Sequence, residues 1–446
     1  MRQAAGGHRA GGVNLKRMNV AVLGGGYAGM AAAVTLAERG IPVTVYEAAA
    51  HLGGRARRVE YNGAKLDNGL HVLIGACRET LRLVNQVDGN GQEALLRLPL
   101  DWHIHGRFRL RVPALPPPLH LAAGLLTARG VSLGARFTAT KFIRALRARQ
   151  FRLDEDTSVA HLLAVHGQHD EMVHSLWRPL CVSALNTPIE TASARVFLNV
   201  LRDGLDTERK NSDILIARRD LTALFPEPAA RYVRARGSEI LVGHTVTAIS
   251  LDDGKFGVAA RGARREFTHL ICALPPHRLL PALSGLPKLS ATTAVVARLK
   301  YQPIYSVYLQ YPGRIRLPAP MVGLADSLAH WLFDRDAICG QAGLVAAVIS
   351  AAGPHQDLTQ GELAGRIHAE VAQHFGPLPM PTWHRVIAEK RATFACIAGV
   401  ERPAQRTALP GFYLAGDYIA SDYPATIEGA VRSGVQGARA VLESHT

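Results

Sequence analysis

The sequence has few cysteines and no long apolar run. Its 446 residues include only five cysteines, which are widely spaced and form no CxxC pair. An odd count without such pairs argues against a disulfide framework or a zinc ribbon, so we expect no metal site and a reducing, cytoplasmic location. No apolar run approaches the roughly 18 residues that a membrane-spanning helix needs.

The N-terminus lacks the continuous apolar stretch of a signal peptide. The first residues, MRQAAGGHRAGGVNLKR, are basic and rich in Gly and Ala. We therefore expect a flexible arm over residues 1–17, or a start site placed too early, with Met18 as the true first residue.

Acidic residues are scarce relative to basic ones. Asp and Glu together number 36 against 51 Lys and Arg, which gives a net charge of +15. Such a charge favours acidic partners, namely nucleic acid, anionic lipid or a ligand that carries a pyrophosphate. The basic residues are scattered along the chain and form no recognition module, so we expect no nucleic-acid partner.

The remaining composition is that of a folded protein, with 48% hydrophobic and 20% charged residues. The length predicts two or three domains. Segments near both ends of the chain, 18–98 and 406–446, carry the strand and helix patterns of nucleotide-binding proteins. The sequence therefore predicts an α/β fold in which a second domain is inserted between the pieces of a discontinuous nucleotide-binding domain.

The strongest motif opens the first of these segments. The apolar strand MNVAVL runs into the loop GGGYAG, which fits G-x-G-x-x-G and precedes a helix. Gly24 permits the tight turn, Gly26 lets the backbone approach a pyrophosphate, and Gly29 lets helix and strand pack closely. The helix start around Ala28 offers free N–H groups to the anion. A second strand ends at Glu47, whose carboxylate would accept hydrogen bonds from ribose hydroxyls and repel a 2′-phosphate.

Two further segments complete the predicted site. In the loop LGGRAR, Gly54 allows a close backbone approach and Arg55 offers donors to a phosphate or a ring system. The strand GFYLAGD ends in Gly416 and Asp417. Asp417 would accept from a ligand hydroxyl, although a helix-capping or turn role is an equal alternative. The next helix begins near Ile427, and its N-terminal amides would face an electron-rich edge of the ligand.

Together these residues resemble the superfamily of FAD-dependent amine oxidases and phytoene desaturases. The match covers GGGYAG, the acid Glu47, LGGRAR, LVGHTVTAI and LAGD. The resemblance implies FAD as the cofactor, a Rossmann-like FAD-binding domain of the GR2 type, adenine held by the backbone of Val246, and an α+β substrate domain over the flavin. We expect the FAD-binding domain over 18–98, 221–285 and 406–446, and the substrate domain over 99–220 and 286–405.

Three longer segments resemble a narrower group, the hydroxysqualene dehydroxylases. They are LDNGLHVLIGACRETLRLV, SALNTPIETASARVFLNVLRD and RRDLTALFPEPAARYVRARG. Members of that group use reduced FAD to replace the hydroxyl of hydroxysqualene with hydrogen, so the resemblance implies an isoprenoid substrate; it identifies no electron donor. Two alternatives remain, which are oxidative desaturation of a polyene such as phytoene and a non-catalytic isoprenoid carrier.

Removal of an allylic hydroxyl requires an acid close to the flavin. His71 lies in the turn DNGLH and has an ordinary pKa suited to proton donation near neutrality. A structural, hydrogen-bonded histidine is the alternative. Asp422 follows Asp417 closely and could also face the flavin, unless it is a plain loop residue. We expect Asp67 and Asn68 to stabilise the turn rather than react.

The segment 115–149 suggests contact with a membrane surface. An apolar, proline-led stretch precedes FTATKFIRALRARQF, where Phe142, Ile143 and Leu146 share one side of a helix with basic residues around them. A basic amphipathic helix can lie on anionic lipid, which would place the protein on the inner face of the cytoplasmic membrane. The alternative is a helix that packs this apolar side onto its own domain.

Overall fold

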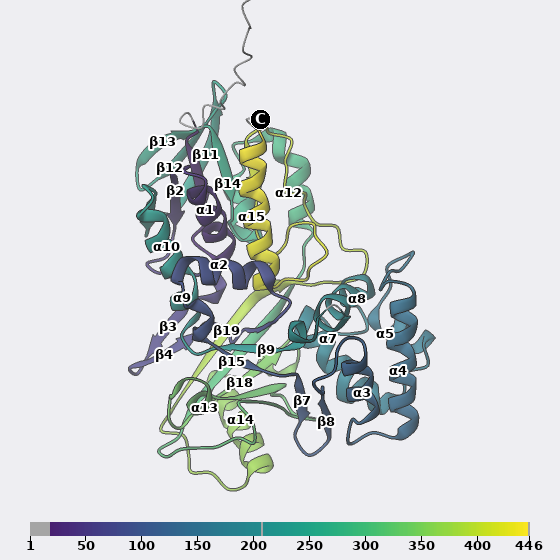
Figure 1. Ribbon diagram of the computed structural model, residues 1–446. Coiled ribbons are helices and arrows are strands. Elements are labelled where there is room, and N and C mark those ends of the chain that lie inside the picture. The colour runs from purple at the N-terminus through teal and green to yellow at the C-terminus, as the bar shows by residue number, and fades with distance from the viewer. Residues whose placement is uncertain (1–17, 207, 445–446) are drawn as a thin grey trace, which may run out of the picture.

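Figure 1 shows the computed structural model, which describes residues 18–206 and 208–444. One part of the molecule contains the first and last helices of the described chain, and the other contains a large sheet with a group of helices beside it. The predicted arm over residues 1–17 lies outside the described residues. None of the helices in the described part of the chain combines the length and hydropathy that spanning a bilayer requires.

The first part is built on a five-stranded parallel sheet. Its strands are short and mostly apolar, and β1 and β14 are buried at every position, as is typical of parallel sheets covered on both faces. The strand order is β10–β2–β1–β14–β20, so the last strand lies close to the first. The strands are β1 Val20–Leu23, β2 Val43–Glu47, β10 Glu239–Val242, β14 His269–Cys272 and β20 Phe412–Leu414.

Different elements cover the two faces of this sheet. Val22 packs with helices α1 (Tyr27–Glu38) and α15 (Ile427–Glu443), whereas Leu23 belongs to the core on the opposite face. An antiparallel sheet covers that opposite face through aromatic contacts with β2 and β20. Its strands are β11 Val246–Asp252, β12 Lys255–Ala260 and β13 Ala263–Phe267.

Small residues allow α1 and α15 to pack closely, and the two helices run beside each other in Figure 1. Helix α1 is rich in alanine and buried along nearly its whole length. A Cβ atom at Gly434 of α15 would lie 2.0 Å from the carbonyl oxygen of Ala28, so a larger residue would push the helices apart. The two ends of the described chain thus form one unit, which confirms the predicted discontinuous α/β fold.

The second part is built on a seven-stranded sheet of order β19–β15–β18–β17–β16–β7–β8. Helix α14 (Gln360–Phe375) packs against β15 and β19 and buries its apolar side there. The strands are β7 Asp101–Ile104, β8 Phe108–Arg111, β15 Tyr301–Gln310, β16 Met321–Gly323, β17 Trp331–Asp334, β18 Leu344–Ser350 and β19 Trp383–Phe394.

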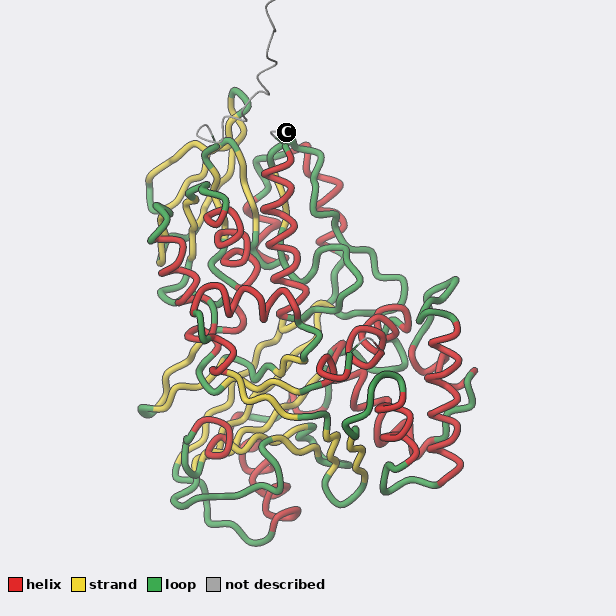
Figure 2. Tube along the Cα trace, viewed as in Figure 1, coloured by secondary structure: helices red, strands yellow, loops and turns green. Residues whose placement is uncertain are grey.

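A group of helices stands beside this sheet, as the helix colouring of Figure 2 makes clear. Three of them, α4, α5 and α8, begin at serines whose hydroxyls accept a backbone N–H of the first turn. The helices are α3 Leu119–Leu126, α4 Leu133–Ala148, α5 Val159–Val165, α6 Asp170–Met172, α7 Arg178–Leu185 and α8 Ala194–Leu201.

Helix α4 turns its predicted lipid-facing side inward. Phe142, Ile143 and Leu146 are all buried, and the ring of Phe142 packs edge-on against Trp177 with centroids 5.4 Å apart. Of the two alternatives for this helix, packing onto its own domain is therefore the one observed. These three side chains do not form a membrane-binding face.

Short strands connect the two parts. The sheet β5–β9–β6 and the hairpin β3–β4 lie between the large sheets in Figure 1. Strand β9 falls in the predicted range 99–220 of the substrate domain but pairs with β5 and β6, which fall in the predicted range 18–98. The strands are β3 Arg58–Tyr61, β4 Ala64–Asp67, β5 Val72–Ile74, β6 Leu95–Leu98 and β9 Ile214–Ala217.

The remaining helices complete the two parts. Helix α2 packs against α15, and α10 packs against α1. The division of the chain into the predicted domain ranges stays a prediction. The helices are α2 Arg78–Asp88, α9 Leu221–Leu224, α10 Pro226–Arg234, α11 Pro276–Ala282, α12 Ser290–Ala297 and α13 Arg335–Cys339.

Gly434→Ala should destabilise the protein by at least ~2 kcal/mol, because the added methyl meets backbone rather than a movable side chain. Gly365→Ala is the matched control, since it lies within α14 with open space around its Cβ position. That control should be neutral or stabilising by about 0.5–1 kcal/mol. Urea unfolding measures both changes, and equal stabilities of the two variants would contradict the close α1–α15 packing.

Candidate cofactor site

The glycine-rich loop forms a tight turn between β1 and α1. Gly24 has φ +108°, a left-handed conformation that favours glycine, and its N–H donates to the carbonyl of Tyr46 at 2.7 Å. A Cβ at Gly29 would lie 1.9 Å from the carbonyl oxygen of Gly24. The helix therefore packs directly on the turn, as the motif predicts.

The N-terminus of α1 faces the second glycine loop. Gly26 precedes the helix and has no side chain to cap it, so the first-turn N–H groups around Ala28 have no side-chain acceptor from the capping position. Gly26 forms a parallel bridge with Gly53, and a Cβ at Gly54 would lie 3.3 Å from the Cα of Gly26. Bare backbone from two loops thus forms a cradle that fits a pyrophosphate.

Glu47 lies at the edge of this cradle. Its Oε2 accepts the N–H of Gly25 at 2.7 Å, and its Oε1 accepts the N–H of Ala49 at 2.8 Å. Its own carbonyl accepts the N–H of His244 at 2.8 Å, which brings the start of β11 and Val246 to the same place. The residues predicted for the adenosine end are therefore neighbours, although their contacts with FAD stay a prediction.

Arg55 and Asp417 form an ion pair that joins the two ends of the chain. Nη2 of Arg55 lies 2.6 Å from Oδ1 of Asp417, and Nη1 donates to the carbonyl of Ala392 at 2.6 Å. Burial lowers the pKa of Arg55, but the carboxylates of Asp417 and Glu389 outweigh it, so the pKa is raised overall. The sequence predicted both residues but not that they bind each other.

The C-terminal segment presents a second helix start to the site. Gly416 has φ +147°, and its N–H donates to the hydroxyl of Ser433 at 2.8 Å. Helix α15 begins at Ile427 and is capped by Thr426, whose hydroxyl accepts the N–H of Gly429 at 3.1 Å. The positive end of the α15 dipole therefore lies in the segment that carries Asp417.

His71 lies close to this ion pair. Its Nδ1 donates to the carbonyl of Gly69 at 2.8 Å, which leaves Nε2 as the free nitrogen. Burial lowers the pKa of His71, the hydrogen bond to Gly69 opposes this, and the positive charge of Arg55 lowers it further. Near neutrality the ring is therefore mostly uncharged, and proton donation would require prior protonation.

Asp67, at the end of β4, is buried and bonded to other segments of the chain, and its predicted role in the turn stays a prediction. Its Oδ1 accepts the N–H of Leu221 at 2.7 Å, and its backbone groups bond the hydroxyl of Tyr308. Burial raises the pKa of Asp67 to about 6. Asp422, by contrast, is exposed, and its carbonyl accepts from Nδ2 of Asn199 at 3.2 Å.

Further polar residues surround the Arg55–Asp417 pair, and of these the sequence pointed only to Asn68, as a turn residue. Asn68 Nδ2 donates to the carbonyl of Arg55 at 3.0 Å and to Oε2 of Glu389 at 3.3 Å. Burial lowers the pKa of His277, and the positive charge of Arg391 lowers it further. Glu389 and Arg391 belong to β19, which rises with β15 from the large sheet toward α15 in Figure 1. No local motif marks them, because only this crossing brings them to the site.

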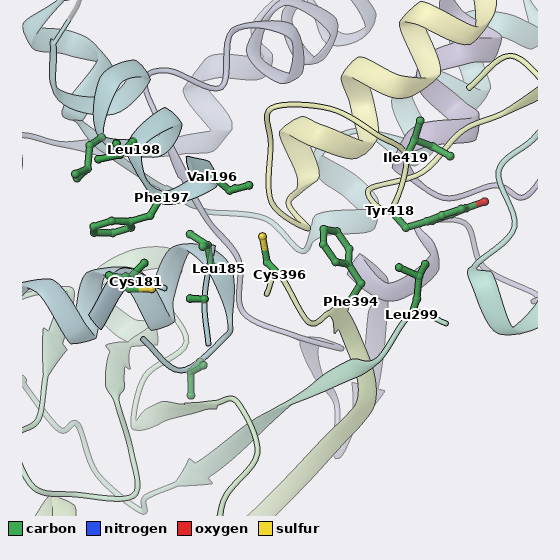
Figure 3. Packing of buried hydrophobic residues seen from close by; sticks show 14 of the residues in the cluster. Cys181, Leu185, Val196, Phe197, Leu198, Leu299, Phe394, Cys396, Tyr418 and Ile419 are labelled. Carbon is green, nitrogen blue, oxygen red and sulfur yellow. The ribbon is translucent and has the colours of Figure 1, made fainter. Parts of the chain in front are cut away.

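A buried apolar cluster, part of which is shown in Figure 3, reaches the pair. Leu185 of α7, Val196 of α8 and Phe394 at the end of β19 lie around Cys396 in this view, and Tyr418 follows Asp417 directly. Burial raises the pKa of Cys396 to about 12, so the thiol stays protonated. Within the described residues, no group of three or more His, Cys, Asp or Glu side chains is placed to hold a metal ion.

Comparisons with known proteins agree on one family. The family model of flavin-containing amine oxidoreductases matches residues 27–442. The hydroxysqualene dehydroxylase of Rhodopseudomonas palustris is 30% identical over 95% of this chain and 98% of its own. A probable zeta-carotene desaturase of Synechococcus elongatus is 25% identical over 96% of this chain and 99% of its own.

Among solved structures, a putative protoporphyrinogen oxidase from Exiguobacterium sp. 255-15 has a similar fold. The TM-score is 0.70, with 96% of this chain and 99% of that chain covered, at 16% sequence identity. At that identity the likeness concerns the fold alone.

Arg55→Ala and Asp417→Ala should each destabilise the protein by about 1–3 kcal/mol, because one leaves the buried carboxylate of Asp417 and the other the partly buried guanidinium of Arg55 without its partner. The double variant should lose less free energy of unfolding than the two single variants lose together. Urea unfolding of the parent, both single variants and the double variant measures this difference. The exposed pair Arg149–Asp154 is the matched control and should show little coupling. Additive changes at Arg55 and Asp417 would contradict the ion pair.

Proposed function

The chain belongs to the flavin-containing amine oxidoreductase family and is an FAD-dependent oxidoreductase, and from this premise we propose that it reductively removes the hydroxyl group of hydroxysqualene to give squalene. The substrate carbon–oxygen bond breaks, the oxygen leaves as water after gaining a proton, and a new carbon–hydrogen bond forms. When bound in its reduced form, FAD would supply the hydride for this reaction and would be oxidised by it.

The protein's own residues have three tasks in this proposal. The glycine cradle at Gly26 and Gly54 and the start of α1 bind the pyrophosphate. Arg55 and Asp417, each fixed by the other, orient the groups near the reactive end. The apolar residues beyond them shield the substrate cation, which water would otherwise capture.

The observation that carries the proposal is an apolar wall, a buried cluster that reaches the Arg55–Asp417 pair at Tyr418 and Phe394. Leu185, Val196 and Phe394 come from three different elements and are all buried in one core. A long hydrocarbon gains free energy from such surroundings, whereas a charged amine would lose its hydration there. The full-length hydroxysqualene dehydroxylase relative supports the same substrate class.

His71 is the acid that we propose for the departing hydroxyl. Nδ1 is engaged with Gly69, so Nε2 would carry the proton that is transferred. Its nearness to Arg55 and Asp417 supports this position. Asp422 is the second candidate, although its exposure means that bound substrate would have to exclude water from it.

Oxidative desaturation of a polyene is the alternative reaction. The zeta-carotene desaturase relative supports it, since such an enzyme also acts on a long isoprenoid. An isoprenoid carrier without turnover has no such support, because the family is one of oxidoreductases. The two reactions require opposite starting redox states of the cofactor.

Product analysis separates the two reactions. With hydroxysqualene and pre-reduced FAD under anaerobic conditions, the holoenzyme should form squalene, detected by mass spectrometry. With phytoene and a quinone, no desaturated product should appear. A desaturated polyene in the second assay and no squalene in the first would favour the alternative.

The rate of dehydroxylation should rise as the pH falls. The pKa of His71 lies below its ordinary value, so the imidazolium fraction grows about tenfold per pH unit on the alkaline side of that pKa. Single-turnover rates across this range should follow that fraction in the parent protein. In His71→Gln the rate should be much lower and independent of pH. An unchanged rate in this variant would exclude His71 as the acid.

A further inference from the structure

Exposed apolar residues are concentrated in one segment of the helical group. Of the eight large hydrophobic residues exposed in the described chain, five lie between residues 115 and 137. Leu133 is 76% exposed and Phe137 60% exposed, and both belong to the first turns of α4. We call this set the α3–α4 apolar surface, and its members are Leu115, Leu119, Leu126, Leu133 and Phe137.

The members of this surface are held together by local structure. The two exposed leucines of α3 are seven residues apart, and Leu133 and Phe137 are four apart, so each pair shares a helix face. Helices α3 and α4 pack against each other. The guanidinium of Arg136 donates to the carbonyl of Val131 at 3.0 Å and of Leu126 at 3.5 Å, which fixes the end of α3 to the start of α4.

Basic residues predominate in the segment that carries this surface, although the carboxylate of Glu171 accepts the N–H of Ser132, next to Leu133, at 3.0 Å. Between residues 102 and 153 the chain has ten Lys and Arg and neither Asp nor Glu. Lys141 and Arg144 are exposed on α4, and the ammonium of Lys141 lies 5.8 Å from the ring centroid of Phe137. The exposed apolar side chains are therefore accompanied by cations, which would attract a negatively charged partner.

We propose that the α3–α4 apolar surface docks onto an anionic lipid bilayer. Leucine and phenylalanine side chains would enter the acyl region, while the surrounding cations bind lipid phosphates. A second copy of the chain is disfavoured as the occupant, because two surfaces of the same positive sign repel each other. This surface differs from the buried side of α4, which packs inward.

The docking surface belongs to the same packed unit as the apolar wall of the site. Phe142 of α4 contacts Trp177, which directly precedes α7, and α7 contributes Leu185 to the wall. The docking proposal rests on the proposed function, because hydroxysqualene and squalene would both be held in lipid. A docking surface near the site would then give the substrate a short path from the bilayer. Docking itself does not require turnover and can be measured separately.

Vesicle sedimentation of the FAD-loaded protein tests the proposal. Parent protein should bind vesicles of phosphatidylcholine mixed with phosphatidylglycerol. It should bind vesicles of phosphatidylcholine alone much more weakly. The double variant Leu133→Asp/Phe137→Asp should bind the anionic vesicles at least about tenfold more weakly. The matched control Val165→Asp/Met380→Asp changes two exposed apolar residues elsewhere and should bind like the parent.

Flavin absorbance and melting temperature establish that each variant is folded. The variant Lys141→Ser/Arg144→Ser should weaken binding to anionic vesicles by about fivefold per charge removed, and salt should weaken parent binding similarly. Equal vesicle binding by parent and Leu133→Asp/Phe137→Asp would overturn the proposal. The proposal would also be overturned if the parent protein formed a dimer in sedimentation velocity and Leu133→Asp/Phe137→Asp abolished that dimer.

Failure of docking and failure of the reaction give different results. Turnover of detergent-solubilised hydroxysqualene should be the same for parent and Leu133→Asp/Phe137→Asp, because neither residue belongs to the cofactor site. Vesicle binding without squalene formation would support docking and count against the proposed reaction. Squalene formation without any vesicle binding would support the proposed reaction and count against docking.

Discussion

Close backbone contact around α1 is the constraint on which the rest of the structure depends. The helix rests on the turn at Gly24 because Gly29 has no Cβ, and α15 rests on α1 because Gly434 has none. These two contacts bring the last helix of the described chain beside the first loop. The ion pair between Arg55 and Asp417 follows from that arrangement, since it spans segments that are far apart in the sequence.

Polar and apolar groups are separated across this ion pair. One side holds Glu389 and Asn68, and the other holds leucine, valine and aromatic residues in a continuous core. Charged groups on the first side are fixed by hydrogen bonds, so they would need little rearrangement when a cofactor binds. The second side is buried from solvent, which the proposed reaction through a carbocation would require.

A fold of this family supports several chemistries, so the fold alone does not identify the substrate. The nature of the wall is more informative than the glycine motif, because the motif concerns only the nucleotide. The same distinction applies to the outer surface. Helix α4 buries one apolar side against Trp177 and presents another, at Leu133 and Phe137, to the solvent. The proposed reaction would use the buried side, and the proposed docking to lipid would use the exposed one.

The sequence by itself determined the nucleotide loop, Glu47, the family and FAD, because these depend on short motifs whose backbone geometry is local. It also indicated that the chain ends belong to one domain. Only the tertiary structure decided that Arg55 binds Asp417, that Glu389 reaches the site, and which side of α4 is buried. Such contacts depend on which elements pack together, and a helix with two apolar sides does not reveal from its sequence which of them meets the core.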